Sequence, residues 1–266
     1  MRRLLRRTAD IGSANTADLA RLIRGYLFGL TLSNGTDATN DIDLTAGECA
    51  SNDAINATRR LLRVPALTKQ LDATWVAGTN QGGRTSSVAI ANGTWHVFAM
   101  RVGGADDVGF DTSVTGANLI VDHAAKSVRR IGSILRESAA IAPFVQDGDY
   151  FQRKASILDV SATNPGIAAV TRTLSVPVGI NVLARCAVSL SPGGVSPSAH
   201  FSDLAVDDEA ITTVGQSITG VVTAITSVTI RTNTSAQVRS RLSASDGTTI
   251  LEMRTLGWID RRGRDA

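Results

Sequence analysis

The sequence is poor in the residues that most often carry chemistry. Its 266 residues include two cysteines, Cys49 and Cys186, and cysteines so far apart form neither a disulfide framework nor a metal site. The motifs H-E-x-x-H and C-x-x-C and the EF-hand loop are missing, so we expect no metal ion and no cofactor. No G-x-S-x-G motif accompanies the three histidines, His96, His123 and His200, so no catalytic residue is assigned. We expect a structural role for His96 and exposed positions for the other two.

Long apolar runs are missing as well. No stretch is long enough to span a bilayer, and the segment after MRRLLRR lacks the apolar core of a signal peptide. We therefore expect cytosolic synthesis without Sec export, and no membrane partner. Aromatic residues make up only 4% of the chain, whereas glycine and small or β-branched residues recur throughout. That composition favours many short strands joined by turns over a helical bundle.

Positive charge is concentrated at the N-terminus. Residues 1–25 contain six arginines and two aspartates, which is +4, against +3 for the whole chain. A helical pattern lies in the same region, because Thr16 can cap a helix and apolar side chains then follow at i, i+3, i+4 and i+7. The candidate anchor and interface residues are Leu19, Leu22, Ile23, Tyr26, Arg2, Arg3, Arg6 and Arg7.

Two interpretations of this N-terminal pattern stay open. The helix packs on its own domain, or it is an arm that docks on a partner. Nucleic-acid contact through the arginine pairs is not favoured, because no aromatic residues are interleaved with them.

From Leu27 onward the pattern is strand and turn. In SSVAIANGTWHVFAM two β-rich runs flank Asn92-Gly93, the dipeptide best suited to a two-residue hairpin turn. The stretch SVRRIGSILRESAAIAPFVQDGDYFQRK, residues 127–154, predicts a meander with a turn at Asp147-Gly148. Its arginines 129 and 130 are either a solvated pair or face a neighbouring subunit.

The second half is again rich in strand patterns. In NVLARCAVSL alternate residues share one face, which predicts that Cys186 is a small core side chain. Asp246-Gly247 predicts a further hairpin, and the tail DRRGRDA is expected to be frayed. The predicted fold is mainly β, with two antiparallel β-sandwich (jelly-roll-like) domains after a short N-terminal helical arm. The arm covers residues 1–26, and the domains cover residues 27–154 and 155–266.

Several phrases, taken in order, resemble a group of bacteriophage and prophage virion proteins described as tail-fibre-like. They are GLTLSNGTDATNDIDLTAGECAS, ALTKQLDATWVAGTNQGG, ANGTWHVFAM, RRIGSILRESAAIAPFVQDGDYFQRK and DVSATNPGIAAVTRTLSVPVGI. The resemblance implies a non-enzymatic structural protein of the virion, a tail-fibre, spike or head-fibre component assembled in the host bacterial cytoplasm. It implies an N-terminal anchor on a portal, collar, tail or capsid protein, and a homo-oligomer with a trimer favoured.

Two alternatives remain from the residues themselves. A carbohydrate-binding module on the virion would contact a host-surface glycan through exposed aromatic residues, for which Trp75, Trp95 and Trp258 are the available tryptophans. A capsule or cell-wall hydrolase would need paired carboxylates. The acidic clusters NDID and VDDE are its only candidates, and solvated strand edges and turns explain both more simply.

Overall fold

The computed structural model describes residues 25–53, 60–211, 217–219 and 222–264. Strands hold 54% of these described residues and helices 3%, which confirms the predicted mainly β class. The chain divides into two compact units, residues 1–142 with 261–266 and residues 143–260. The boundary expected at residues 154 and 155 lies inside one long strand, β13 (Tyr150–Thr163). None of the helices in the described ranges has the length and apolar character needed to cross a membrane.

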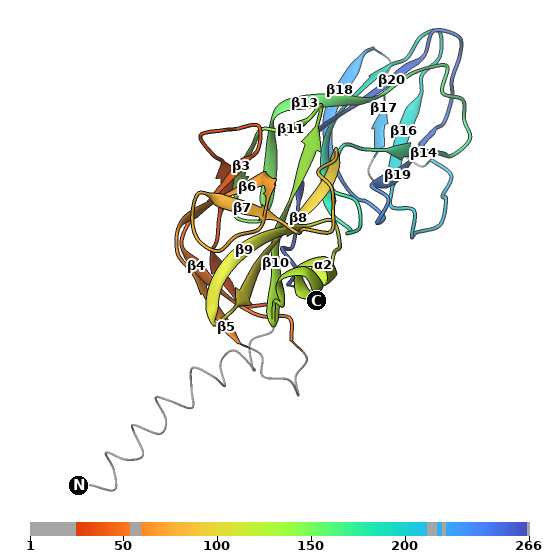
Figure 1. The fold of residues 1–266 in the computed structure, drawn as a ribbon. Coiled ribbons are helices and arrows are strands. Elements are labelled where there is room, and N and C mark those ends of the chain that lie inside the picture. Colours follow the sequence, from red (N-terminus) through yellow and green to blue (C-terminus); the bar gives the residue numbers. More distant parts are fainter. Residues whose placement is uncertain (1–24, 54–59, 212–216, 220–221, 265–266) are drawn as a thin grey trace, which may run out of the picture. The chain divides into compact units, whose positions relative to one another are not determined.

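The first unit is built from two sheets (Figure 1). Its strands are β1 Leu27–Gly29, β2 Leu32–Asn34, β3 Asp41–Leu44, β4 Gly47–Ala50, β5 Leu61–Val64, β6 Leu67–Thr74, β7 Gln81–Arg84, β8 Gly93–Val102, β9 Ala105–Asp111, β10 Ser127–Glu137 and β11 Ala140–Ile141. The smaller sheet is antiparallel, with the order β1-β4-β5. The larger sheet runs in the order β11-β10-β8-β9-β7-β6-β3-β2, and its β6–β7 and β7–β9 pairs are parallel.

A short helix, α2 (Ala117–His123), follows β9 in the first unit. Its backbone N–H groups at Asn118 and Leu119 donate to the Asp111 carboxylate at 2.9 and 3.1 Å, so a side chain at the end of β9 satisfies the helix start. Leu119 is buried against Phe98 and its neighbours. Gly109 makes room for it, because a Cβ there would lie 2.8 Å from the Leu119 side chain. No sequence pattern had predicted this helix.

The second unit also contains two sheets. Its strands are β12 Phe144–Asp147, β13 Tyr150–Thr163, β14 Val170–Thr173, β15 Leu183–Ser191, β16 Ser198–Ser202, β17 Ser217–Thr219, β18 Ala224–Arg231, β19 Gln237–Leu242 and β20 Ile250–Ile259. Within the unit one sheet has the order β12-β13-β20-β15-β18, and the other has β14-β19-β16-β17. The predicted turn at Asp147-Gly148 joins the antiparallel pair β12 and β13.

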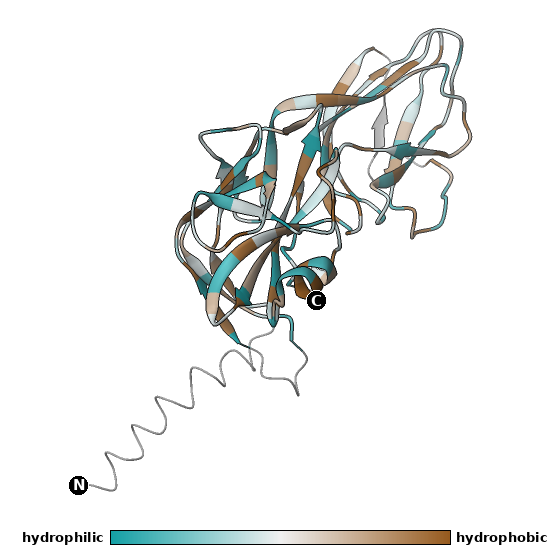
Figure 2. Cartoon of the chain, viewed as in Figure 1, coloured by the Kyte–Doolittle hydropathy of each residue, from teal (hydrophilic) through white to brown (hydrophobic). Residues whose placement is uncertain are grey.

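Strand β15 shows how the sequence pattern becomes a core. Its residues Ala184, Cys186, Val188 and Leu190 are fully buried, as their alternation predicted. Hydrophobic and hydrophilic bands alternate in the same way along many strands in Figure 2. Burial raises the pKa of the Cys186 thiol to about 12. The prediction that Cys186 is a core side chain is therefore confirmed.

Both predicted hairpins outside the meander are wrong. The run before Asn92-Gly93 is not a strand, and β8 begins at Gly93. The Asn92 side-chain oxygen instead accepts hydrogen bonds from Arg136 and from the Ala139 N–H, at 3.2 and 3.0 Å, and so fixes the turn between β10 and β11. At Asp246-Gly247 the flanking strands β19 and β20 belong to different sheets of the second unit and do not pair.

Asp246 ties two loops of the second unit together. Its Oδ1 accepts the N–H groups of Thr248 and Thr249 at 2.9 and 2.8 Å, and its Oδ2 accepts the N–H of Gly194 at 2.6 Å. The backbone hydrogen bond from Thr248 is the largest of the effects that lower the Asp246 pKa to about 2.

We expect these hydrogen bonds to Asp246 to make the stability of the protein depend on pH. Because the folded-state pKa of Asp246 lies below its ordinary value, its contribution is complete above about pH 4 and is lost as the pH falls through about 2. In Asp246→Asn the melting temperature should therefore fall less between pH 5 and pH 2 than in the wild type, as measured by circular dichroism. The control is Asp207→Asn on an exposed loop. Equal losses in Asp246→Asn and the wild type would contradict the assignment.

Candidate functional site: a hollow on the small sheet

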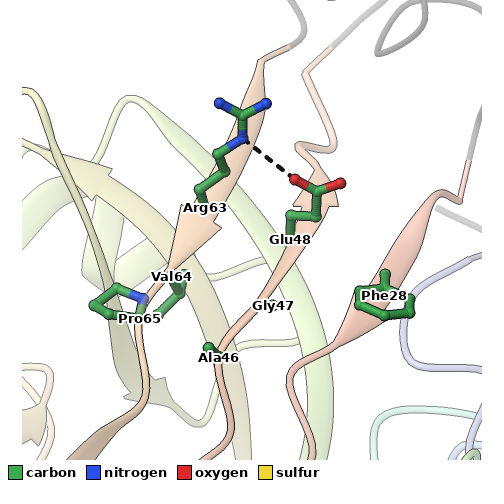
Figure 3. A pocket seen from close by; sticks show the side chains of 7 residues that line it. All are labelled: Phe28, Ala46, Gly47, Glu48, Arg63, Val64 and Pro65. Carbon is green, nitrogen blue, oxygen red and sulfur yellow. Dashed lines mark hydrogen bonds and ion pairs between the residues drawn. The ribbon is translucent and has the colours of Figure 1, made fainter.

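Three side chains form a row across the small sheet of the first unit. Phe28 on β1 is in register with Glu48 on β4, and Glu48 is in register with Arg63 on β5. Residues directly opposite one another in antiparallel strands present their side chains on the same face. The other face carries Cys49 and Leu62, which are fully buried, and burial raises the pKa of the Cys49 thiol to about 12. The side chains of Phe28, Glu48 and Arg63 therefore lie on the outer face of this sheet (Figure 3).

This outer face is hollowed. The hollow has a volume of about 510 Å³ and is lined by Phe28, Ala46, Gly47, Glu48, Arg63, Val64 and Pro65. Phe28 is 69% exposed, although a phenyl ring is costly to leave in water. Gly47 is needed for the close approach of β1, since a Cβ at this position would lie 2.3 Å from the Phe28 carbonyl oxygen.

One carboxylate organises the polar side of the hollow. Glu48 accepts a hydrogen bond from the Tyr26 hydroxyl and another from Arg63 Nε at 3.2 Å. The hydrogen bond to Glu48 is the main reason that the pKa of Tyr26 is raised above its ordinary value. The Arg63 side chain is 67% exposed, so this ion pair adds at most about 1 kcal/mol to stability. This ion pair therefore orients the guanidinium of Arg63 and adds little to the stability of the fold.

The position of Arg63 is also fixed from the other side. Its backbone N–H donates to Asp106 Oδ2 at 2.8 Å, and Arg101 donates to the Leu61 carbonyl at 3.4 Å. Arg101 and Asp106 form an ion pair of 2.6 Å with each other. Backbone groups along the edge of β5 are thus satisfied by side chains, and that edge is closed to another strand.

The structure describes one of the eight predicted anchor residues. Tyr26 lies immediately before β1, is partly buried, and binds Glu48. The other seven lie outside the described residues. Sequence reasoning missed Phe28, Glu48 and Arg63 as a group. The apolar alternation of Tyr26 and Phe28 is the one signal that could have indicated a shared strand face.

The predictions for the arginine pair of the meander are both wrong. Arg129 and Arg130 are buried, so they are neither solvated nor available to a neighbouring subunit. Arg129 donates to the Asn52 side-chain oxygen at 3.0 Å, and Arg130 donates to Ser133 Oγ at 2.9 Å. Both arginines therefore form hydrogen bonds within the first unit.

The histidines do not form a catalytic arrangement in the described residues. His96 is buried and its Nδ1 lies 2.8 Å from Ser133 Oγ, which confirms the expected structural role. The expected exposure of the other two is wrong. His123 is partly buried against Trp75, with ring centroids 5.0 Å apart, and burial lowers its pKa. His200 is half-buried on β16.

The acidic clusters are also separate. Asp41 and Asp43 lie on β3 in the first unit, whereas the VDDE cluster lies in the second. Asp43 accepts a hydrogen bond from Thr68 at 2.6 Å, and Asp208 pairs with Arg241 at 2.9 Å. In the described part of the chain, no group of three or more histidine, cysteine, aspartate or glutamate residues is placed to hold a metal ion.

Two of the three tryptophans are unavailable to a sugar. Trp95 and Trp258 are each only 1% exposed, so Trp75 alone reaches the surface, and only in part.

Comparison of the chain with models of protein families, with curated proteins and with solved structures gives no match.

Proposed function

We propose that this protein is a non-enzymatic structural component of a bacteriophage particle, attached through its N-terminal end. The support from sequence is the resemblance between residues 29 and 180 and tail-fibre-like virion proteins. The observation in the structure that carries the proposal is the surface beside β1. There an exposed aromatic residue, Phe28, lies on the strand that follows the arginine-rich N-terminal segment in sequence, and an oriented arginine, Arg63, lies on the same face of the small sheet.

Aromatic residues, including phenylalanine, and arginine are enriched at protein–protein interfaces. Tyr26, predicted as an anchor residue, belongs to the same surface through its hydrogen bond to Glu48. In the proposal, both the N-terminal segment and this outer face of the small sheet take part in attachment. A trimer is the favoured assembly under it, with the β body projecting from the particle.

The proposal extends to the architecture of the second unit, in which the two sheets would pack as a β-sandwich. Each sheet has one buried face. On β15 the buried residues are those of the Cys186 face, and on β19 Val238, Ser240 and Leu242 are buried. Sheets with one apolar face are stabilised by packing these faces together.

Deletion of residues 1–24 tests the attachment. The truncated protein keeps Tyr26 and its bond to Glu48, so its thermal unfolding should match that of the full chain. Its incorporation into particles should fall at least tenfold, measured by quantitative immunoblot of purified particles from a host that supplies the protein in trans. Deletion of the two C-terminal residues is the matched control. Incorporation of the truncated protein at the full-length level would contradict the proposal.

A further inference from the structure

The hollow on the small sheet has an apolar part and a cationic part, and together they indicate the chemistry of its partner. We propose that the hollow receives an apolar or aromatic side chain from an acidic segment of the particle protein to which this chain attaches. This inference rests on the proposed function and names the kind of surface that the N-terminal end contacts.

The apolar part exposes Phe28, Ala46 and Pro65, whereas Val64 lines the hollow but is buried. The hollow is shallow and open to solvent, so a partner side chain would lie against this surface rather than be enclosed by it. Burying the face of Phe28 under a partner side chain removes exposed apolar area from water, which favours binding. The Phe28 backbone is held by pairing with β4, so little conformational freedom is lost when this surface is covered.

The cationic part is the guanidinium of Arg63. Its Nε is bound to Glu48, and within the described residues its two terminal nitrogens make no hydrogen bond. A guanidinium presents paired N–H groups that match a carboxylate. Glu48 is already engaged by Tyr26 and Arg63, so it does not recruit a cation from the partner. The charges of Glu48 and Arg63 neutralise each other, so the terminal nitrogens of Arg63 are the part of the hollow that can bind a carboxylate.

The wider charge of this end has the same sign as Arg63. Residues 1–25 carry +4 by sequence, and Arg60, which precedes β5, is exposed. A partner with acidic residues would associate faster and more strongly at low salt. A protein segment fits better than a nucleic acid. Single-stranded nucleic acid is bound by successive stacked aromatic residues, and Phe28 is the one aromatic that lines this hollow.

The test uses the full-length protein and three labelled probes. The first is a peptide of eight glutamates around a central tryptophan, the second has alanine in place of the tryptophan, and the third is a single-stranded oligonucleotide of thymidines. We expect the tryptophan peptide to bind most tightly in fluorescence anisotropy. Phe28→Ala and Arg63→Ala should each weaken that binding at least fivefold, and Arg63→Ala should also reduce its salt dependence. Matched controls are Val121→Ala, at a position 81% exposed, and Arg254→Ala, at an exposed arginine of the second unit.

Three results would overturn the inference. They are equal binding of the two peptides, tighter binding of the oligonucleotide, and peptide binding that Phe28→Ala and Arg63→Ala leave unchanged. Particle incorporation separates this failure from failure of the proposed function. If deletion of residues 1–24 abolishes incorporation but the two substitutions do not, the docking inference fails and the attachment stands. If the deletion has no effect on incorporation, the proposed function itself fails, whatever the peptides show.

Discussion

Replacement of Lys69 by methionine is expected to lower the free energy of unfolding by about 3–5 kcal/mol. Lys69 on β6 is only 1% exposed, and its Nζ lies 3.0 Å from Asp107 Oδ2 and 2.7 Å from the Val76 carbonyl oxygen. The substitution would leave the carboxylate of Asp107 buried without its counter-ion. Breaking one side of a buried pair costs far more than an exposed pair contributes, because the remaining charge stays desolvated without its counter-ion.

The same pair fixes an exposed loop. Asp107 also accepts the N–H of Gly78 at 2.9 Å, while Lys69 binds the carbonyl of Val76, so both ions hold the loop that follows Trp75. The Lys69 ammonium lies 5.4 Å from the Trp75 ring centroid, which adds a cation–π contact. Desolvation lowers the pKa of Lys69 and the charge of Asp107 opposes this. Desolvation thus offsets part of the attraction between the two charges, so the net contribution of the pair to stability is smaller than the cost of breaking it.

Urea unfolding of three variants separates these effects. Lys69→Met should show the full loss, and the double variant Lys69→Met with Asp107→Leu should lose less than the single one, because no charge stays buried. Lys126→Met, at an exposed lysine, should change the free energy of unfolding by less than about 0.5 kcal/mol. A loss below about 1 kcal/mol in Lys69→Met would show that the pair is not as buried as described.

The second large effect is expected at the C-terminal segment. Arg262 is buried, and its guanidinium donates to the carbonyl oxygens of Ile131, Gly29 and Leu30. The expectation of a frayed tail is therefore wrong for residues 260–264. Arg262→Met should lower the free energy of unfolding by about 3 kcal/mol, since each buried carbonyl left without a donor costs about 1–3 kcal/mol and removing the buried charge offsets part of that.

Hydrogen exchange gives a local measurement of this effect. Relative to the wild type, Arg262→Met should speed hydrogen exchange at the amides of β1 and β10 more than at those of β15. The reason is that the hydrogen bonds lost from Arg262 end at Gly29 and Ile131 in the first unit. Arg261→Met, at the exposed neighbouring arginine, is the control and should leave exchange nearly unchanged. Equal effects of the two substitutions would mean that charge in the tail, and not the Arg262 hydrogen bonds, stabilises this end.

The strands that could be predicted are those whose local pattern agrees with their surroundings. β15 alternates along its whole length, and β8 and β12 were likewise expected as strands. The failures share a different cause. Asn92-Gly93 has the composition of a hairpin turn, but hydrogen bonds to Arg136 and Ala139, more than 40 residues away, decide its role.

A contact with a residue far away in the sequence also explains why the surroundings of Arg129 were predicted wrongly. Arg129 is polar in sequence and buried in the fold because Asn52 supplies an acceptor. The candidate site has the same origin. The row exists only after three strands align, because Phe28 and Glu48 are 20 positions apart in the sequence and Glu48 and Arg63 are 15 apart. Tyr26 was identified from a helical spacing, and the structure instead places it beside a strand.

The burial of both native thiols has a practical consequence for following this protein in an assembly. Cys49 and Cys186 are the only cysteines, both are reduced and buried, and burial raises the pKa of each to about 12. Thiolates are the species that react with maleimides, so neither native residue competes for the dye at neutral pH. A single cysteine introduced at an exposed position such as Val121 would carry a fluorophore stoichiometrically. The proposed attachment to a particle can then be followed one molecule at a time on an otherwise native chain.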